Sequence, residues 1–425
     1  MLADRCWFFC LVILGCSTFC SDRPVLMAQT SVENDWTGWR GANRDDLSKE
    51  TGLLKSWPEN GPKNLWTVDT GGLGYAGFAA VGERLFTLGS TGDSEFAICL
   101  NVQDGSTIWK QTIDDLFENN WGDGPRNTPT VDGDRVYVLS ASGQLKCLST
   151  EDGSEKWAVS LTEQLGGERP FWGFSESPLI DGDQVICTPG GKQGAVVALN
   201  KLTGATIWQS KDFTNPCHYS SIIVADVNQQ KQYIQLFEKA LVGFDADNGD
   251  VIWQQDWSGR IAVIPTPIFE DNKVYVSSGY GAGSMLVDVS DGENVKKVWF
   301  SSKMKNHHGG VILLDGHYYG YSDKVGWLCQ SAKTGGVVWK EKEALQKGAI
   351  SYADNRFYLL EEKSGQVVLI NAAPDGWQEF GRFQLKPLSE NRKQKGKVWV
   401  HPVISNGRMF LRDQEMIYCF DISGR

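Results

Sequence analysis

One short phrase recurs along the chain and limits what the chain can fold into. It consists of two small or apolar residues, a polar residue, a stretch ending in glycine, and a tryptophan four residues later, as in Cys99-Leu100-Asn101 leading to Gly105 and Trp109. The tryptophans at this position are Trp109, Trp157, Trp208, Trp253, Trp299 and Trp339. In the seventh copy Phe380 stands where tryptophan is expected. A spacing of about 40 to 50 residues suits a repeat of four short strands.

The two ends of the chain carry complementary halves of one further copy. The segment Cys419-Phe420-Asp421 starts an eighth copy that stops before any tryptophan, whereas Leu65-Trp66-Thr67-Val68 is an ending without a beginning. A ring closed by pairing these halves leaves no free sheet edge. The sequence therefore predicts an all-β, eight-bladed β-propeller of four-stranded blades at residues 65–425, whose last blade is closed by the N-terminal strand.

The repeated tryptophan is interpreted as a structural residue. A large flat side chain at one position of every repeat wedges neighbouring blades together, and its indole N–H finds a backbone carbonyl. The residues assigned to this blade-docking role are Trp66, Trp109, Trp157, Trp208, Trp253, Trp299 and Trp339.

The cysteines give little sign of a disulfide framework. Cys99, Cys147, Cys329 and Cys419 share one repeat position. Equivalent positions on different blades lie too far apart for a disulfide, so these four are expected to be small buried apolar residues. Cys187 and Cys217 remain as one conceivable pair, which the sequence does not decide.

The N-terminus has the pattern of an export signal. Arg5 precedes an apolar core from Cys6 to Leu14, which is too short to span a membrane, and residues 1–28 are expected to be a signal peptide. A competing interpretation is a lipid anchor at Cys16. Residues 29–64 then form a lead-in segment before the propeller. We expect a periplasmic or secreted protein with no membrane span after signal removal.

The charge of the chain argues against nucleic acid as a partner. The formal net charge is −11 at pH 7. An acidic surface of this size repels phosphate backbones.

The repeat resembles that of the pyrroloquinoline quinone (PQQ) enzyme family, over about Leu65 to Arg425. That family also covers non-enzymatic relatives, such as the propeller lipoprotein of the bacterial outer-membrane assembly machinery. The lead-in sequence Trp39-Arg40-Gly41-Ala42-Asn43-Arg44-Asp45 further resembles the opening of secreted PQQ-repeat proteins, some of which are called polyvinyl-alcohol dehydrogenase by similarity.

Two departures separate this chain from the dehydrogenases of that family. They typically carry a disulfide between adjacent cysteines, stacked on the quinone, and this chain has no Cys-Cys pair. They are also usually longer, with insertions that cover the cofactor. PQQ with calcium is therefore a conceivable cofactor that the cysteine pattern does not support, and no cofactor is firmly implied.

Candidate binding residues lie where chain segments enter the innermost strands, on one rim of the propeller. Side chains from every blade converge there. The candidates are Trp121, Asp123, Arg126, Arg169, Trp172, Glu176, His218, Tyr219, Arg260, His307, His308, Lys347, Trp399 and His401. The turns between second and third strands are expected to add Asp93, Lys192, Glu238, Asp323, Glu361 and Arg412 to the same rim.

These residues leave four interpretations open. In the first, the rim side chains only pack the ring. They can instead form a scaffold site for a protein, peptide or glycan of the cell envelope, the leading functional hypothesis. The alternative is a PQQ-dependent oxidoreductase acting on alcohols, polyols or sugars, with Glu176 or Asp123 near calcium. A metal site at His218, His307, His308 and His401 is the fourth, although strand alternation predicts that only one of His307 and His308 faces the channel.

Overall fold

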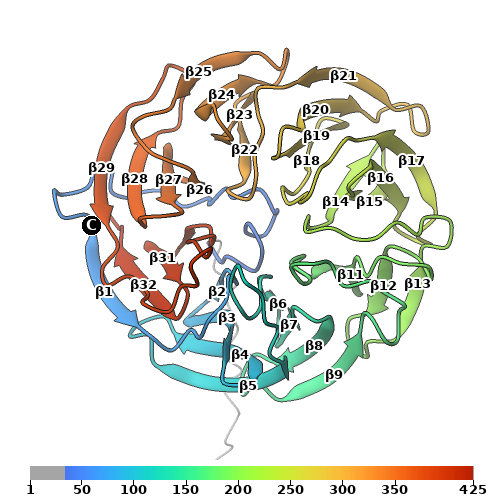
Figure 1. Ribbon diagram of the computed structural model, residues 1–425, viewed down its shortest axis with the longest axis horizontal. Helices are drawn as coiled ribbons and strands as arrows, with labels where there is room; N and C mark the ends of the chain where they lie inside the picture. The colour runs from blue at the N-terminus through green and yellow to red at the C-terminus, as the bar shows by residue number, and fades with distance from the viewer. Residues whose placement is uncertain (1–33, 425) are drawn as a thin grey trace, which may run out of the picture. The chain divides into compact units, whose positions relative to one another are not determined.

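The protein is a ring of eight antiparallel sheets around a central channel (Figure 1). The computed structural model describes residues 34–424, and each sheet has four strands. The predicted all-β, eight-bladed propeller is thus confirmed. The expected signal peptide at residues 1–28 and the alternative lipid anchor at Cys16 lie outside the described residues.

Consecutive strands build each blade from the channel outwards. Blades one to four are β2 (Ala79–Val81), β3 (Arg84–Thr91), β4 (Ser94–Asn101), β5 (Thr107–Asp115); β6 (Thr130–Asp132), β7 (Arg135–Leu139), β8 (Gln144–Ser149), β9 (Glu155–Ser160); β10 (Leu179–Asp181), β11 (Gln184–Cys187), β12 (Val197–Asn200), β13 (Thr206–Gln209); and β14 (Ile223–Val227), β15 (Gln230–Leu236), β16 (Ala240–Asp245), β17 (Val251–Asp256). Blades five to seven are β18 (Ile268–Glu270), β19 (Lys273–Ser278), β20 (Gly283–Asp288), β21 (Lys296–Ser301); β22 (Val311–Leu314), β23 (His317–Ser322), β24 (Gly326–Ser331), β25 (Val337–Glu341); and β26 (Gly348–Ala353), β27 (Arg356–Glu361), β28 (Gln366–Asn371), β29 (Glu379–Gln384).

The eighth blade joins the two ends of the chain. Its inner strands are β30 (Val403–Ser405), β31 (Arg408–Asp413) and β32 (Met416–Asp421), and its outer strand is β1 (Lys63–Val68). β1 runs antiparallel to β32, with Trp66 opposite Cys419. This pairing is the predicted closure by the N-terminal strand.

Arg412 secures the same junction from inside. Its side chain is fully buried. It donates to Thr87 Oγ1 and to the carbonyl oxygens of Ala76 and Leu88 in the first blade, at 2.6 to 3.0 Å. The expectation that Arg412 lies on the rim is therefore wrong, because its guanidinium satisfies backbone carbonyls between blades eight and one.

The repeated tryptophans dock each blade on the next. The indole N–H of Trp157 in blade two donates to Lys201 O in blade three at 2.9 Å, and Gly204 lies against the same ring. A Cβ on Gly204 would approach that ring to 2.8 Å, so the close contact requires glycine. The tryptophans that donate to a carbonyl of the following blade in this way are Trp66, Trp109, Trp157, Trp208, Trp299 and Trp339.

Two blades depart from this contact where the repeat itself departs. Trp253 in blade four donates to Gln232 Oε1 of its own blade at 2.7 Å. The next blade carries an insertion between Gly292 and Trp299, and a Cβ on Gly292 would meet no atom within 4 Å, so this turn does not lie against Trp253. In blade seven, where Phe380 replaces tryptophan, the lead-in residue Trp57 packs against Phe383 with ring centroids 5.3 Å apart.

The cysteines are small buried residues. Cys99, Cys147, Cys329 and Cys419 are fully buried free thiols. Cys187 and Cys217 lie in one apolar cluster and are also free thiols.

The lead-in segment crosses the channel and contacts all eight blades. Its central residues, Trp36 to Ser48, make these contacts mostly through main-chain groups and two arginines. In blade order the contacts are Trp36 with Ala80, Thr37 O with Val131 N, Arg44 with Ser177 O and Pro178 O, Arg44 with Ile222 O, Trp39 with Thr266, Arg40 with Val311 O, Ser48 N with Tyr352 O, and Asp46 with His401. We call residues 36–48 the plug.

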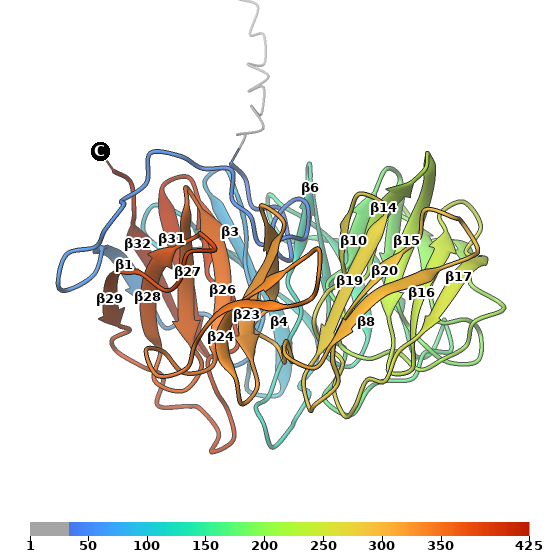
Figure 2. The same cartoon turned by 90° about the horizontal axis from the view of Figure 1, so that it is seen from above.

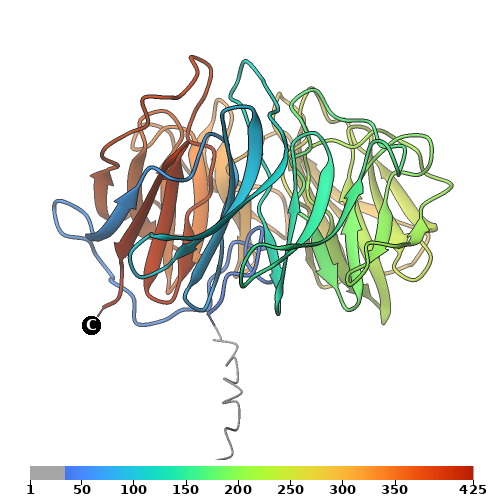
Figure 3. The ribbon, with the colours of Figure 1, turned by 90° about the horizontal axis from the view of Figure 1, so that it is seen from below.

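The plug makes the two faces of the ring different. The lead-in segment runs along one face, and the long loop before β30 rises from the other, as the two side views show (Figures 2 and 3). Within residues 34–424, no helix is long and apolar enough to cross a membrane.

Candidate functional site

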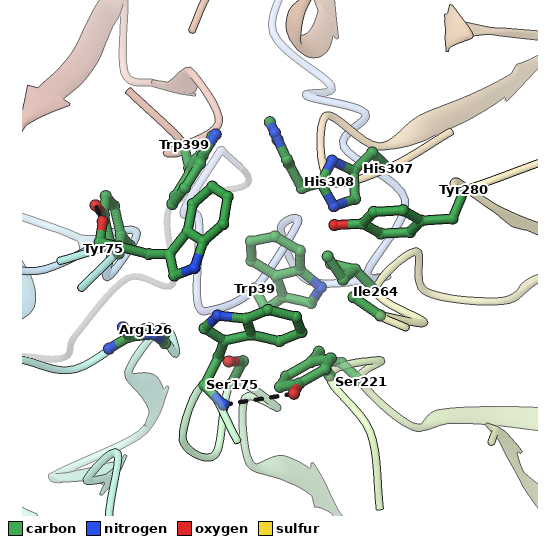
Figure 4. Close-up of a pocket in the computed structure, with 14 residues that line it drawn as sticks. Trp39, Tyr75, Arg126, Ser175, Ser221, Ile264, Tyr280, His307, His308 and Trp399 are labelled. Carbon is green, nitrogen blue, oxygen red and sulfur yellow. Dashed lines mark hydrogen bonds between the residues drawn. The ribbon is translucent and has the colours of Figure 1, made fainter. Parts of the chain in front are cut away.

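A funnel opens at the centre of the face opposite the plug (Figure 4). It encloses about 930 Å³ including its open mouth. We call it the rim funnel. Its lining consists of Trp39, Tyr75, Trp121, Arg126, Trp172, Ser175, Tyr219, Ser221, Ala262, Ile264, Tyr280, His307, His308 and Trp399.

Most of the wall is a series of touching rings. The ring centroids of Trp121 and Trp399 lie 6.3 Å apart, and those of Trp121 and Trp172 lie 6.4 Å apart in an edge-to-face arrangement. Further contacts of 4.8 to 5.6 Å extend the series through Tyr219 on one side and through His308, His307 and Tyr280 on the other. Such rings present flat apolar faces together with a few polar edges.

Segments between blades position these rings. The loop after β5 brings Trp121, the loop after β9 brings Trp172, and the loop after β29 brings Trp399. The main-chain N–H of Trp172 donates to the Tyr219 hydroxyl at 3.4 Å, which links blades three and four. The Tyr75 hydroxyl donates to Trp121 O, and burial raises the pKa of Tyr75 to about 12. These aromatic residues lie in loops, and their positions are therefore fixed by contacts with one another.

Arg126 is the cation of the lining. Its guanidinium donates to Gly122 O and Gly124 O, and it lies 5.0 Å from the centroid of the Phe117 ring. Burial lowers the pKa of Arg126, although an arginine remains protonated at neutral pH. Among residues 34–424, no carboxylate lies within 4.0 Å of its guanidinium.

His307 and His308 both line the funnel, so the expectation that only one of them faces the channel is wrong. The two residues lie in an irregular segment before β22, where strand alternation does not apply. Burial lowers the pKa of His308 well below its ordinary value, and the charge of Lys347 adds to this effect. Burial and the neighbouring His308 likewise lower the pKa of His307. Both shifts favour the neutral form of the ring at pH 7.

Half of the predicted rim residues meet in the funnel. They are Trp121, Arg126, Trp172, Tyr219, His307, His308 and Trp399.

The other predicted residues lie elsewhere, and most of them have protein partners. Asp123 pairs with Lys393 at 2.6 Å, and Lys347 contacts Asp323 at 2.9 Å and His307 Nδ1 at 2.7 Å. Arg169 and Arg260 are exposed, and His218 Nε2 lies 3.9 Å from Glu238.

Glu176 and His401 point towards the plugged end. The Glu176 carboxyl group is buried between blades three and four and accepts hydrogen bonds from Thr188 and from the Ile222 N–H. Burial raises the pKa of Glu176 to about 7. His401 Nδ1 lies 3.1 Å from Asp46, and its Nε2 lies 2.9 Å from His308 O.

Three ring-bearing residues of the lining, Trp39, Tyr75 and Tyr280, are not among the residues predicted from the sequence. Tyr75 lies in the segment that enters blade one, where an aromatic residue among glycines was a readable signal. Tyr280 lies in the turn between β19 and β20 with a positive φ of 54°. Trp39 comes from the plug, and no repeat pattern places it in the channel.

The donor atoms of the funnel do not suit a metal centre. Among the described residues, no group of three or more His, Cys, Asp or Glu side chains is placed to hold a metal ion. The lining contains no carboxylate. Glu362 lies behind it, where its Oε2 accepts from the Trp399 indole at 3.1 Å and lies 2.7 Å from His308 Nε2.

The family of the chain follows from its repeat. The family model described as outer membrane protein assembly factor BamB, a PQQ-type repeat model, matches residues 94–341, which is more than half of the chain. The chain belongs to this family.

Individual BamB proteins resemble parts of the chain. BamB of Burkholderia pseudomallei is 26% identical over 237 residues, which cover 53% of this chain and 55% of that protein. BamB of Escherichia coli is 32% identical over 87 residues, covering 20% and 21% of the two chains. The chain thus spans about half the length, or less, of these curated relatives.

Solved structures share the propeller. The crystal structure of BamB from Moraxella catarrhalis matches with a TM-score of 0.57 and 17% identity, covering 80% of this chain and 94% of that one. Quinohemoprotein alcohol dehydrogenase from Comamonas testosteroni matches with a TM-score of 0.64 and 12% identity, covering 93% and 82%. At these identities the likeness concerns the fold alone.

Proposed function

We propose that the protein is an extracytoplasmic scaffold that binds a protein partner through the rim funnel. The observation that carries this proposal is the funnel itself, a concave and largely aromatic surface built from several blades at one face of a rigid ring. Aromatic side chains dominate the energetics of protein interfaces. Membership of the BamB family supports a partner of protein rather than of glycan.

The mouth of the funnel adds to this support. Phe171 is 75% exposed and Ile261 is 60% exposed, and both lie beside residues of the lining. Trp121 and Tyr280 are also unusually exposed for large apolar side chains. Exposed apolar residues that gather around a cavity are typical of an interaction site.

The periplasmic or secreted location is part of the proposal. It is supported by the expected signal peptide and by the name of the family, which refers to an outer membrane protein assembly factor. A lipid anchor at Cys16 would hold the propeller at a membrane surface.

A quinone-dependent dehydrogenase is the rival function, and the fold of the quinohemoprotein alcohol dehydrogenase is its main support. Calcium takes six to eight oxygen ligands, and protein carboxylates are usually among them. The funnel offers no carboxylate, and the two proposed ligands are engaged elsewhere, Asp123 by Lys393 and Glu176 by Thr188 and Ile222. The residues present do not fit a calcium-bound PQQ.

Capture experiments with a matched control test the scaffold proposal. The purified protein is used as bait in envelope extracts, beside a variant with Trp121, Trp172 and Trp399 changed to Ala. The control is Phe300→Ser on the outer strand β21, which removes an exposed apolar residue away from the funnel.

The proposal expects one protein to be captured by the wild type and the control and lost from the triple variant, with unchanged circular dichroism. Equal capture by all three would contradict it. Dialysis with PQQ and calcium, followed by an absorption spectrum, tests the rival directly, and a bound quinone would favour the dehydrogenase.

A further inference from the structure

We propose that the rim funnel receives the C-terminal residue of its partner polypeptide, with the free carboxylate at Arg126 and a large apolar side chain among the tryptophans. This inference rests on the proposed function and names the part of the partner that the site recognises. It follows from the blind end of the channel, from one unpaired cation and from the aromatic lining.

The channel is open at one end only. Trp39 lies at the base of the funnel, and its indole N–H is fixed to Thr266 Oγ1 at 2.9 Å. Behind it, Arg40 and Arg44 bind carbonyl oxygens of blades three, four and six. An extended chain cannot thread through this plug, so a polypeptide enters the funnel with one of its ends or with a side chain.

Arg126 selects between the two ends of a polypeptide. Its two hydrogen bonds to Gly122 O and Gly124 O use two of the five N–H donors of a guanidinium, and the other three have no acceptor among residues 34–424. Arg126 is only partly exposed, and a cation that is partly withdrawn from water gains from a counter-ion. A ligand carboxylate would pair with Arg126, whereas the ammonium group of an N-terminus would be repelled.

The nearby carboxyl groups do not neutralise Arg126. Glu95 and Asp123 are close enough to raise its pKa against the effect of burial. However, Glu95 Oε2 accepts from the Ala141 N–H at 3.0 Å, and burial raises the pKa of Glu95 to about 7. Asp123 pairs with Lys393 at 2.6 Å. Neither carboxyl group lies within 4.0 Å of the guanidinium, so a ligand carboxylate would be its direct counter-ion.

Basic residues beside the mouth also favour an anionic ligand. Residues 392–397 read Arg-Lys-Gln-Lys-Gly-Lys, within a chain of net charge −11. Arg392 and Lys393 form ion pairs with Asp413 and Asp123. Lys395 has no ion pair among the described residues, and its Nζ lies 5.4 Å from the centroid of the Trp121 ring. This loop places positive potential where a carboxylate would arrive.

The lining suits the side chain of the terminal residue. Trp121, Trp172 and Trp399 form one continuous wall, and the neutral His307 and His308 add no charge opposite Arg126. These rings offer flat apolar faces to a side chain that enters from the mouth of the funnel. We therefore expect a C-terminal Phe, Trp, Leu or Met to be preferred over a polar residue.

Fluorescence anisotropy with matched peptides tests this inference on the full mature chain. Labelled peptides of one sequence ending in Phe are compared as the free acid and as the C-terminal amide. We expect the acid to bind at least about tenfold more tightly, since the amide loses the charge-assisted pair with Arg126. The variant Arg126→Met should bind acid and amide equally, while Arg260→Met, an exposed arginine outside the funnel, should keep the difference.

The outcomes separate this inference from the proposed function. Equal binding of acid and amide, or a difference that persists in Arg126→Met, overturns the inference, while tryptophan-dependent capture of a partner would still stand. If free aromatic acids such as indole-3-acetate bind as tightly as the peptide acid, the funnel is a small-molecule site. The inference that it receives the C-terminus of a polypeptide is then overturned. The inference is supported if Arg126→Met loses the preference for the peptide acid and Arg260→Met keeps it.

Discussion

Both ends of the central channel hold arginines, but the arginines differ in what surrounds them. At the plugged end, Arg44 donates to Ile222 O, Ser177 O and Pro178 O at 2.5 to 2.9 Å, and Arg40 Nε lies 2.5 Å from Asp46. At the open end, Arg126 binds two carbonyls of its own loop and no carboxylate within residues 34–424. Charge at the first end is used within the fold, and charge at the second is available to a ligand.

Tryptophan also has different roles in the blades and at the open end of the channel. The repeated tryptophans donate to the next blade and are almost fully buried, as with Trp157 at 7% exposed. Trp121 at the open end is 37% exposed, and its neighbours are other rings. The same residue type therefore stabilises the ring in one place and forms a binding surface in the other.

The largest effect is expected from Asp46→Asn at the plugged end. The substitution leaves Arg40 buried without its counter-ion, and the free energy of unfolding should fall by about 3–5 kcal/mol. Denaturant titration measures it. Asp134→Asn is the control, because Asp134 is 86% exposed beside Arg135 and should change stability by less than about 1 kcal/mol. If both substitutions lowered the free energy of unfolding equally, the buried ion pair of Asp46 would contribute no more to stability than the exposed pair of Asp134.

The pH dependence of stability tests Glu176 at the same end. Burial raises the pKa of Glu176 to about 7, above its ordinary value of 4.5, so the folded state holds the proton more tightly. The stabilisation is fully present below pH 4.5 and is lost as the pH rises through about 7. It amounts to about 3 kcal/mol at most.

The measurement is the free energy of unfolding of the wild type minus that of Glu176→Gln, across pH 4.5 to 7. The difference should decline steadily, because the glutamine variant lacks this proton. Burial lowers the pKa of His308, so this residue destabilises the protein as the pH falls, opposite to the effect of Glu176. Because both proteins contain His308, its contribution cancels in the difference. If the stabilities of the two proteins changed with pH in parallel, the raised pKa of Glu176 would be contradicted.

Paired Trp→Phe substitutions compare the two uses of tryptophan. Trp157→Phe loses the bond to Lys201 O and part of the packing against Gly204, and should cost about 2 kcal/mol. Trp121→Phe should stay within about 0.5 kcal/mol, since its side chain is more than a third exposed. A large cost at Trp121 would show that the funnel wall is needed for folding.

Much of the ring could be predicted because its contacts are local and repeated. The orphan strand at Leu65–Val68 and the incomplete copy at Cys419–Asp421 predict closure, since each lacks what the other supplies. The departures of Trp253 and Phe380 also follow from visible irregularities, an insertion and a substitution.

The plug could not be predicted in the same way, because its contacts are distant and unrepeated. Asp46 and His401 are 355 residues apart in sequence, and no periodicity connects them. The histidine prediction failed for a different reason. Strand alternation was applied to His307 and His308, which lie in an irregular segment where adjacent side chains can face the same cavity.

Equilibrium unfolding of Arg44→Met and Arg126→Met, measured side by side, tests the central claim most directly. Arg44→Met should lose at least about 3 kcal/mol, because three buried carbonyls lose their donor. Arg126→Met should stay within about 1 kcal/mol of the wild type, since Arg126 is partly exposed, no carboxylate within residues 34–424 pairs with it, and methionine would lie among the same rings. If Arg126→Met were as destabilising as Arg44→Met, the main role of Arg126 would be to stabilise the fold. Its charge would then not be available to bind a ligand, which would contradict the account.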